Sequence, residues 1–262
     1  MRNKIHILSS LYCNNNTFHI PNVQADYLVL GGNCGDNLRF INPLINAAAR
    51  YKEVFVVLGN NDYTDKDIVY IRRQISETFK KHNIDNVSIL SNNFRSIQPT
   101  DLIRAGSFCE KGIILAGSTL WTDFSNDKEL ISNSKLFLSE FSGGITVEGK
   151  PFTTDEVIEA NNKSKEFLNW FSTRFKKSEY KKIVVTNNIP SIKLLREDIK
   201  NNPLAGAFVS DCEHILENID IWICGHEYCK PDTMINGCRV LSNTRGRTTG
   251  SKNFNPELVI EI

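Results

Sequence analysis

Short apolar runs, many of them rich in β-branched residues, recur along the chain, and most end in Gly, Ser or Asn. Such runs are typical of core strands followed by loops. They read IHILSSL, DYLVLGG, EVFVVLGN, GIILAGSTLW, KKIVVTNN, IDIWICG, RVLSN and LVIEI. The pattern predicts a sheet-rich core with a loop after each strand.

Between these runs, apolar residues recur at three- and four-residue spacing, which is the period of an amphipathic helix. The spacing predicts helices over residues 37–51, 64–82, 153–175 and 209–216. Strands that alternate with helices indicate an α/β fold with helices on the sheet faces. Ligands in such folds bind at the carboxyl ends of the strands, so we expect functional residues in the loops there.

The chain is predicted to form a single domain over residues 1–262. It has 262 residues, of which 40% are hydrophobic, and no segment forces a division. That length is enough to bury one large core. The segment 123–154 is rich in Ser, Gly and Lys and has few long apolar runs, so it is expected to be a lid or excursion.

Net charge and cysteine content indicate which partners and which cellular location to expect. The formal net charge is +1 at pH 7, so no global field would attract nucleic acid or an anionic membrane, and neither is expected as a partner. The N-terminal apolar run is too short for a membrane span. The seven cysteines contain no CxxC pair, which favours reduced thiols and a cytoplasmic location.

Five loop segments, each after a predicted strand, follow one another in a diagnostic order. They are ILSSLYC (7–13), LVLGGN (28–33), LGNND (58–62), VVTNNIPS (184–191) and ICGHEY (223–228). The order resembles the calcineurin-like metallophosphoesterases, whose signatures read S-D-x-H, G-D, G-N-H-[DE], T-H-[HN]-x-P and G-H-x-H. Further similarity at 115–124, 208–213 and 242–262 extends it over essentially the whole chain, and it is similar to the short, soluble bacterial and phage branch. The resemblance implies two packed mixed β-sheets flanked by helices, an αββα four-layer sandwich.

The resemblance also implies a metal-dependent reaction, and most of the required side chains are replaced. The family uses two divalent ions, such as Mn, Fe or Zn, to activate a shared hydroxide. The family's seven ligand positions fall on Ser10, Tyr12, Asn33, Asn60, Asn187, His226 and Tyr228. Of these, Asn60 and His226 keep the family residue. The family's leaving-group acid falls on Asn61, whose amide cannot act as a general acid.

The altered positions are therefore Ser10, Tyr12, Asn33, Asn61, Asn187 and Tyr228. Hydroxyl, phenol and amide groups are poor ligands for these ions, and no carboxylate remains to bridge them. We expect no catalytic residue and no bound metal or other cofactor.

Three functions are compatible with these replacements. The leading hypothesis is a catalytically inactive homologue, a sensor or sponge, that binds a phosphate-bearing or nucleotide-like ligand. Its cleft would be lined by Asn33, Asn60, Asn61, Asn187, His226 and Arg245. The alternatives are a non-catalytic scaffold for a protein partner and a residual phosphoesterase with a remodelled single-metal site. Drift in an Asn-rich chain would also give polar replacements.

Several residues near the motifs carry separate expectations. Arg245 matches the family's tail motif and could bind phosphate bidentately, joined by Arg247 and Arg39, or it could tie the tail to its neighbours. Asp36 is expected to cap the helix that begins at residue 37, and Asp62 the helix that begins at residue 64.

Three thiols, those of Cys13, Cys34 and Cys229, each stand within one residue of a former ligand position. They could converge, together with His226, into a zinc-competent set. The alternative is that they are ordinary free thiols on partly buried loops.

Overall fold

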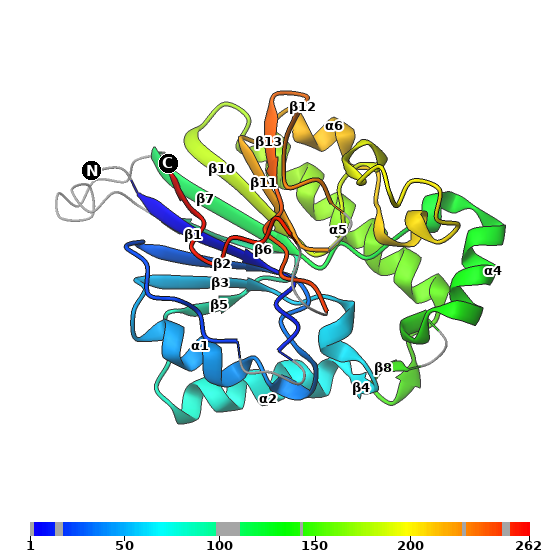
Figure 1. The fold of residues 1–262 in the computed structure, drawn as a ribbon, viewed down its shortest axis with the longest axis horizontal. Helices are drawn as coiled ribbons and strands as arrows, with labels where there is room; N and C mark the ends of the chain where they lie inside the picture. The colour runs from blue at the N-terminus through cyan, green and yellow to red at the C-terminus, as the bar shows by residue number, and fades with distance from the viewer. Residues whose placement is uncertain (1–2, 14–17, 98–110, 142–143, 227–228, 248–251) are drawn as a thin grey trace.

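Two large β-sheets lie against each other, with helices on the faces turned away (Figure 1). The computed structural model describes residues 3–13, 18–97, 111–141, 144–226, 229–247 and 252–262. The first sheet has the strand order β14-β1-β2-β3-β5. Its strands are β1 (Lys4–Ser9), β2 (Tyr27–Gly31), β3 (Glu53–Val57), β5 (Val87–Ile89) and β14 (Val259–Glu261). All but β14 run parallel.

The second sheet has the order β12-β13-β11-β10-β7-β6, with a parallel centre and antiparallel edge strands. Its strands are β6 (Asn93–Ile97), β7 (Lys111–Ser118), β10 (Glu179–Thr186), β11 (Ile221–Cys224), β12 (Asp232–Ile235) and β13 (Cys238–Leu241). A small third sheet joins β4 (Lys66–Asp67), β8 (Ile145–Val147) and β9 (Lys150–Pro151). All the predicted strands are present, and the predicted α/β class is confirmed.

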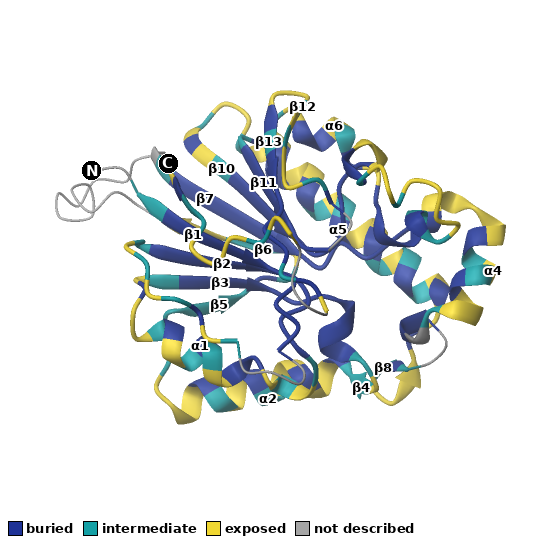
Figure 2. Cartoon of the chain, in the orientation of Figure 1, coloured by how far each residue is buried: buried dark blue, intermediate teal, exposed yellow. Residues whose placement is uncertain are grey.

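Alternating side chains along the strands divide the core into layers. Ile5, Ile7 and Phe55 of the first sheet share a buried cluster with Leu115 and Val185 of the second. The residues between them point outward into two further clusters. One includes residues of helices α1 (Ile41–Ala48) and α2 (Ile68–Lys81), and the other includes residues of α5 (Thr154–Arg174) and α6 (Glu213–Leu216). The strands are buried along most of their length, whereas the outer helix surfaces are exposed (Figure 2).

The helices are α1 (Ile41–Ala48), α2 (Ile68–Lys81), α4 (Lys128–Phe137), α5 (Thr154–Arg174) and α6 (Glu213–Leu216). Of the four predicted helices, α5 matches closely, because Thr153 and Glu156 form a reciprocal capping box at its start. The others are shorter than predicted. Helix α1 follows a 3-10 turn at residues 36–38, α2 follows strand β4, and α6 begins only at Glu213. Among the described residues, no helix is long and apolar enough to cross a membrane.

Both predicted caps are wrong. The 3-10 turn η1 (Asp36–Leu38) separates Asp36 from α1, which begins only at Ile41, and Asp36 instead lies 3.7 Å from Arg39. The cap of α2 is Asp67, whose carboxylate accepts the backbone N–H groups of residues 69 and 70. Asp62 lies within a separate turn, η2 (Asn60–Tyr63), and its carboxylate accepts the backbone N–H groups of Gly35 and Gly59.

The segment 123–154 has secondary structure of its own. It contains the 3-10 turns η3 (Phe124–Asn126) and η4 (Ser139–Phe141) besides α4, β8 and β9. Phe124 and Phe141 pack edge to face, with ring centroids 5.0 Å apart, and both belong to the cluster that covers the first sheet. Strand β8 pairs in parallel with β4. This segment is therefore joined to the core by both packing and strand pairing.

Candidate functional site

The loops that follow β1, β2, β3, β10 and β11 meet at one end of the two sheets, as their motif order predicts. Backbone hydrogen bonds join Ser10 N to Gly32 O (3.1 Å) and Gly225 N to Thr186 O (2.8 Å). A Cβ atom on Gly225 would lie 2.4 Å from the carbonyl oxygen of Gly31. Only glycine permits so close an approach, which brings the two sheets' loops together.

Four of the motif positions have a left-handed backbone. The φ angles are 43° at Ser10, 45° at Tyr12, 43° at Asn33 and 61° at His226. Residues other than glycine rarely adopt this conformation, and it costs free energy that the surrounding contacts must supply. The loops thus hold these side chains in defined directions.

Three asparagines form the centre of the site and bind neighbouring groups. Asn33 donates to the Tyr12 hydroxyl (3.0 Å), while its Oδ1 accepts the backbone N–H of Asn61 (3.0 Å). Asn187 donates to Oδ1 of Asn60 (3.1 Å) and to Oδ1 of Asn188 (3.0 Å). All these side chains are buried. The three neutral side chains are called here the amide cluster (Asn33, Asn60, Asn187). Most of their donors and acceptors bind one another or neighbouring groups, and Oδ1 of Asn187 has no partner among the described residues.

A carboxylate that sequence reasoning missed also reaches the amide cluster. Oε1 of the buried Glu140, in η4, accepts a hydrogen bond from Nδ2 of Asn60 at 2.9 Å. The two residues are eighty positions apart, and η4 belongs to the predicted excursion. No sequence motif includes Glu140, so only the tertiary structure could have identified it as part of the site.

Arg247, rather than Arg245, lies against Asn61 and Tyr12. Its Nη2 donates to Oδ1 of Asn61 at 3.3 Å, and its guanidinium carbon lies 5.3 Å from the centre of the Tyr12 ring. Arg245 instead donates to the Leu11 carbonyl (2.6 Å) and stacks on Phe18. This geometry matches the tail-anchoring alternative for Arg245. Arg39 pairs with Asp36.

His226 is held as a neutral imidazole. It is buried, and its ring stacks on Phe208 with centroids 4.3 Å apart. Burial, together with the positive charge of Arg247, lowers the pKa of His226 to about 3. Its backbone N–H donates to the Ser10 hydroxyl (3.1 Å). Tyr228, the other predicted position on this loop, lies outside the described residues.

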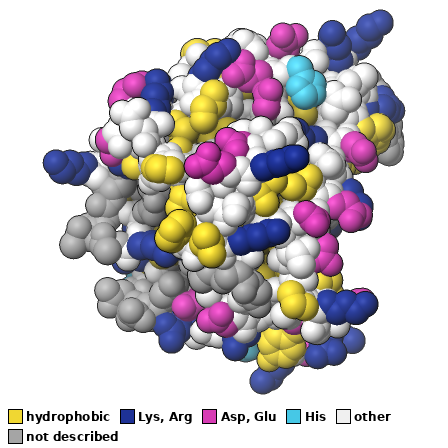
Figure 3. All heavy atoms as spheres, turned by 90° about the vertical axis from the view of Figure 1, so that its right-hand side faces the viewer, with side chains coloured by type: hydrophobic (Ala, Val, Ile, Leu, Met, Phe, Trp, Pro, Cys, Tyr) yellow, Lys and Arg dark blue, Asp and Glu magenta, His cyan; other side chains and the backbone are white. Residues whose placement is uncertain are grey.

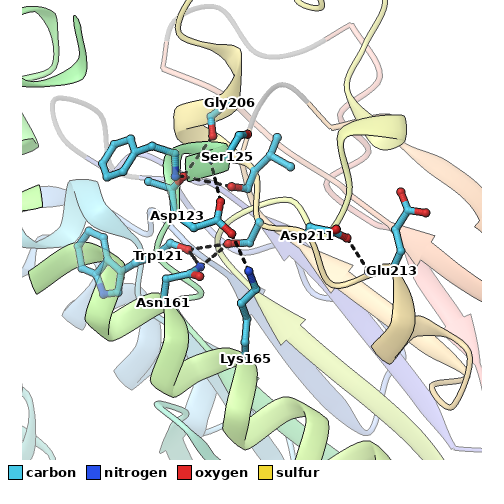
Figure 4. Close-up of polar contacts among 12 residues, drawn as sticks. Trp121, Asp123, Ser125, Asn161, Lys165, Gly206, Asp211 and Glu213 are labelled. Atoms are coloured by element: carbon cyan, nitrogen blue, oxygen red, sulfur yellow. Dashed lines mark hydrogen bonds and ion pairs between the residues drawn. The ribbon is translucent and has the colours of Figure 1, made fainter. Parts of the chain in front are cut away.

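The segment that carries Phe208 is anchored by helix α5 (Figure 4). Asn161 of α5 donates to both the Trp121 carbonyl and the Ser210 hydroxyl. Lys165, one turn later, forms a 2.6 Å ion pair with the buried carboxylate of Asp123. These bonds fix the start of the excursion and the turn η6 (Ala205–Phe208) on one helix. The Phe208 ring that stacks on His226 is therefore positioned by contacts distant from the motifs.

The Asp62 carboxylate joins two of the loops by hydrogen bonds to their backbone. Its Oδ1 accepts the backbone N–H of Gly35 (2.7 Å) and its Oδ2 that of Gly59 (2.8 Å), so one carboxyl group joins the second and third motifs. Complete burial raises the pKa of Asp62 to about 7, although the backbone N–H groups favour the ionised form.

The three thiols of the proposed zinc set are distributed over two core clusters. Cys13 and Cys34 belong to the cluster against α1 and α2, whereas Cys229 belongs to the cluster against α5 and α6. The Cys229 thiol lies 3.1 Å from the thiol of Cys224. All four are buried free cysteines.

The described residues do not fit the two divalent ions that the resemblance implies. The oxygen atoms of Ser10, Asn33 and Asn60 already accept N–H groups from within the site. Of the two carboxylates there, Asp62 is directed at backbone amides and Glu140 accepts from Asn60. Two adjacent divalent ions need several anionic oxygen ligands to offset their charge.

Replacing Gly59 by alanine is expected to disrupt the amide cluster. The added Cβ would lie 2.2 Å from Oδ1 of Asn33 and 2.3 Å from Oδ1 of Asn187. We expect a loss of about 1–3 kcal/mol in the free energy of unfolding, measured by urea denaturation. Gly59 has a φ of −105°, so alanine there meets the cluster without left-handed backbone strain. Gly237→Ala, whose added Cβ has open space, measures the cost of backbone strain alone. A Gly59→Ala variant as stable as the wild type would contradict a packed cluster.

Comparison with known proteins supports the fold. No protein-family profile matches the chain. The protein described as "Uncharacterized protein L509" of Acanthamoeba polyphaga mimivirus is 24% identical over 225 residues, covering 81% of this chain and 74% of the relative.

Two solved structures cover nearly all of this chain. The phosphopantetheinyl hydrolase PptH of Mycobacterium tuberculosis superposes with a TM-score of 0.67 at 12% identity, over 100% of this chain and 96% of that one. A second structure gives a TM-score of 0.54 at 14% identity, over 93% and 91%. The chain therefore has an α/β phosphoesterase-like fold.

Proposed function

We propose that this chain is a catalytically inactive member of the metallophosphoesterase fold, arranged as an αββα sandwich, that binds a phosphate-bearing or nucleotide-like ligand. The observation that carries the proposal is the pairing of Asn61 with Arg247. Arg247 donates to the Asn61 carbonyl oxygen, while Nδ2 of Asn61 is buried and has no hydrogen-bond partner among the described residues. An amide donor that lacks a partner beside a guanidinium favours an anion that can accept from both.

The chemistry of the amide cluster argues against turnover. Phosphoester cleavage depends on strong electrostatic stabilisation of the transition state and on protonation of the leaving group. The cluster is neutral, and Asn61 stands where the family's acid would be. Binding requires only a few oriented donors and so tolerates the loss of both features.

Calorimetric titration with nucleotides, cyclic dinucleotides and inorganic phosphate tests the proposal. We expect at least one to bind and Arg247→Ala to weaken it about tenfold or more, since hydrogen bonds to charged groups contribute about 1.5–3 kcal/mol. Arg73→Ala, an exposed arginine on α2, is the matched control. Absence of heat with every ligand and a folded protein would contradict ligand binding.

Inactivity has its own test. We expect purified protein to contain no stoichiometric Mn, Fe or Zn and to show no turnover of bis-p-nitrophenyl phosphate after Mn addition. Stoichiometric metal together with measurable turnover would instead support a residual phosphoesterase with a single-metal site.

A second candidate function, a scaffold for a protein partner, is favoured by one surface feature. Leu136 and Phe137 at the end of α4 are 73% and 70% exposed. On the face of the molecule toward which α4 lies, hydrophobic side chains are interspersed with charges of both signs (Figure 3). Partner capture that is lost in a Leu136→Ser, Phe137→Ser variant but not in Val69→Ser would support this candidate over ligand binding.

A further inference from the structure

A pair of thiols lies directly behind the His226 loop. The Sγ atoms of Cys224 and Cys229 are 3.1 Å apart, about 1 Å more than the length of a disulfide bond. Cys224 is the last residue of β11, and Cys229 follows the loop that carries His226. We infer that Cys224 and Cys229 form a redox-sensitive pair that a peroxide converts to a disulfide.

Backbone contacts hold both thiols in place. Cys224 is paired with Thr186 of β10 within the second sheet. Cys229 forms an isolated bridge with Leu195, and the next residue, Lys230, donates its N–H to the Leu194 carbonyl at 2.8 Å. Because these contacts bring the two sulfur atoms together before oxidation, little chain ordering is needed to form the bond.

The reaction requires an oxidant, which we specify as hydrogen peroxide. Cys229, slightly exposed whereas Cys224 is fully buried, attacks one peroxide oxygen as the thiolate. The O–O bond breaks, and Cys229 becomes a sulfenic acid while the second oxygen leaves as hydroxide and takes up the thiol proton as water. The sulfur of Cys224 then displaces the sulfenic hydroxyl, which leaves as a second water with the Cys224 proton. Two thiols and one peroxide thus give one disulfide and two waters.

The cross-link would close a short ring around His226. The His226 N–H binds Ser10, and the His226 imidazole stacks on Phe208. The disulfide would therefore fix the part of the site that the second sheet contributes. Cross-links of this size restrict mainly the unfolded chain. The oxidised protein should therefore unfold at a temperature several degrees higher than the reduced protein.

The test treats the folded protein with hydrogen peroxide and then blocks the remaining thiols with N-ethylmaleimide under denaturing conditions. Peptides are mapped without reduction after digestion with a protease that cleaves after glutamate, because the glutamate at position 227 separates Cys224 from Cys229 in the sequence. We expect the peptides containing Cys224 and Cys229 to be joined, with the loss of two hydrogen atoms, and to separate after dithiothreitol. Cys229→Ser and Cys224→Ala should each abolish the product, and Cys212→Ser, which changes another buried thiol, should not.

Three outcomes would overturn the inference. The first is a dominant disulfide between Cys224 and Cys238, because the Cys238 thiol also interacts electrostatically with Cys224. The second is sulfinic acid at Cys229 without a cross-link. The third is full recovery of both thiols as maleimide adducts. Circular dichroism of each variant shows whether it folds, and two different variants protect the test against failure of one. The readout does not depend on any ligand.

Discussion

Asp62→Ala is expected to lower the free energy of unfolding by about 2–4 kcal/mol, because two buried backbone N–H groups lose their acceptor and each orphaned group costs about 1–3 kcal/mol. Those groups belong to Gly35 and Gly59, on the loops that follow β2 and β3. The variant should therefore loosen both loops together. Urea denaturation at pH 6 measures the loss.

Asp85→Ala provides the control for this prediction, since Asp85 is exposed, and such changes usually alter stability by less than about 0.5 kcal/mol. Amide hydrogen exchange gives a second readout, in which Gly35 and Gly59 should lose protection in Asp62→Ala. A loss no larger than that of Asp85→Ala would show that Asp62 does not brace the loops.

The second large effect is a pair of opposed pH dependences from Asp62 and His226. Burial raises the pKa of Asp62 from 3.8 to about 7. The contribution of this shift to the free energy of unfolding is therefore full below pH 3.8 and is lost as the pH rises toward 7. Burial lowers the pKa of His226 from 6.5 to about 3, so its contribution is full above pH 6.5 and is lost as the pH falls toward 3. Between about pH 4 and pH 6.5 the two contributions oppose each other.

Single variants should separate the two contributions. In Asp62→Asn, stability should rise with pH between 4 and 6.5 relative to the wild type, by up to about 1.4 kcal/mol per pH unit. In His226→Asn, which tolerates the left-handed backbone at φ 61°, stability should fall with pH by a similar slope. The measurement is urea denaturation at half-unit pH steps.

The double variant Asp62→Asn, His226→Asn is the internal control, because it should restore the wild-type slope over the same range. Slopes of the same sign in the two single variants would contradict the opposed assignments. Identical slopes in the wild type and both single variants would show that neither group titrates differently on folding.

Most of the fold could be predicted because its central strands are apolar and β-branched along their whole length. Edge strands β5, β6 and β12 escaped prediction, since they are short or partly polar and partly exposed. Helix α4, KELISNSKLF, has few apolar residues and buries mainly Leu130. Its periodicity is therefore weak, and the sequence predicts only that the segment containing it is a lid or excursion.

The sequence alone determined which loops form the site, since motif order fixes the strand that each loop follows, and parallel strands bring those loops to one end of the sheets. Through the resemblance, it also predicted that the carboxylates and imidazoles of a two-metal centre are largely replaced. The tertiary structure decided which side chains meet there. Glu140 reaches Asn60 from the excursion, Arg247 takes the place expected for Arg245, and Cys229 meets Cys224. These contacts depend on the path of segments far apart in the chain or on side-chain directions within a loop, and neither leaves a local pattern in the sequence.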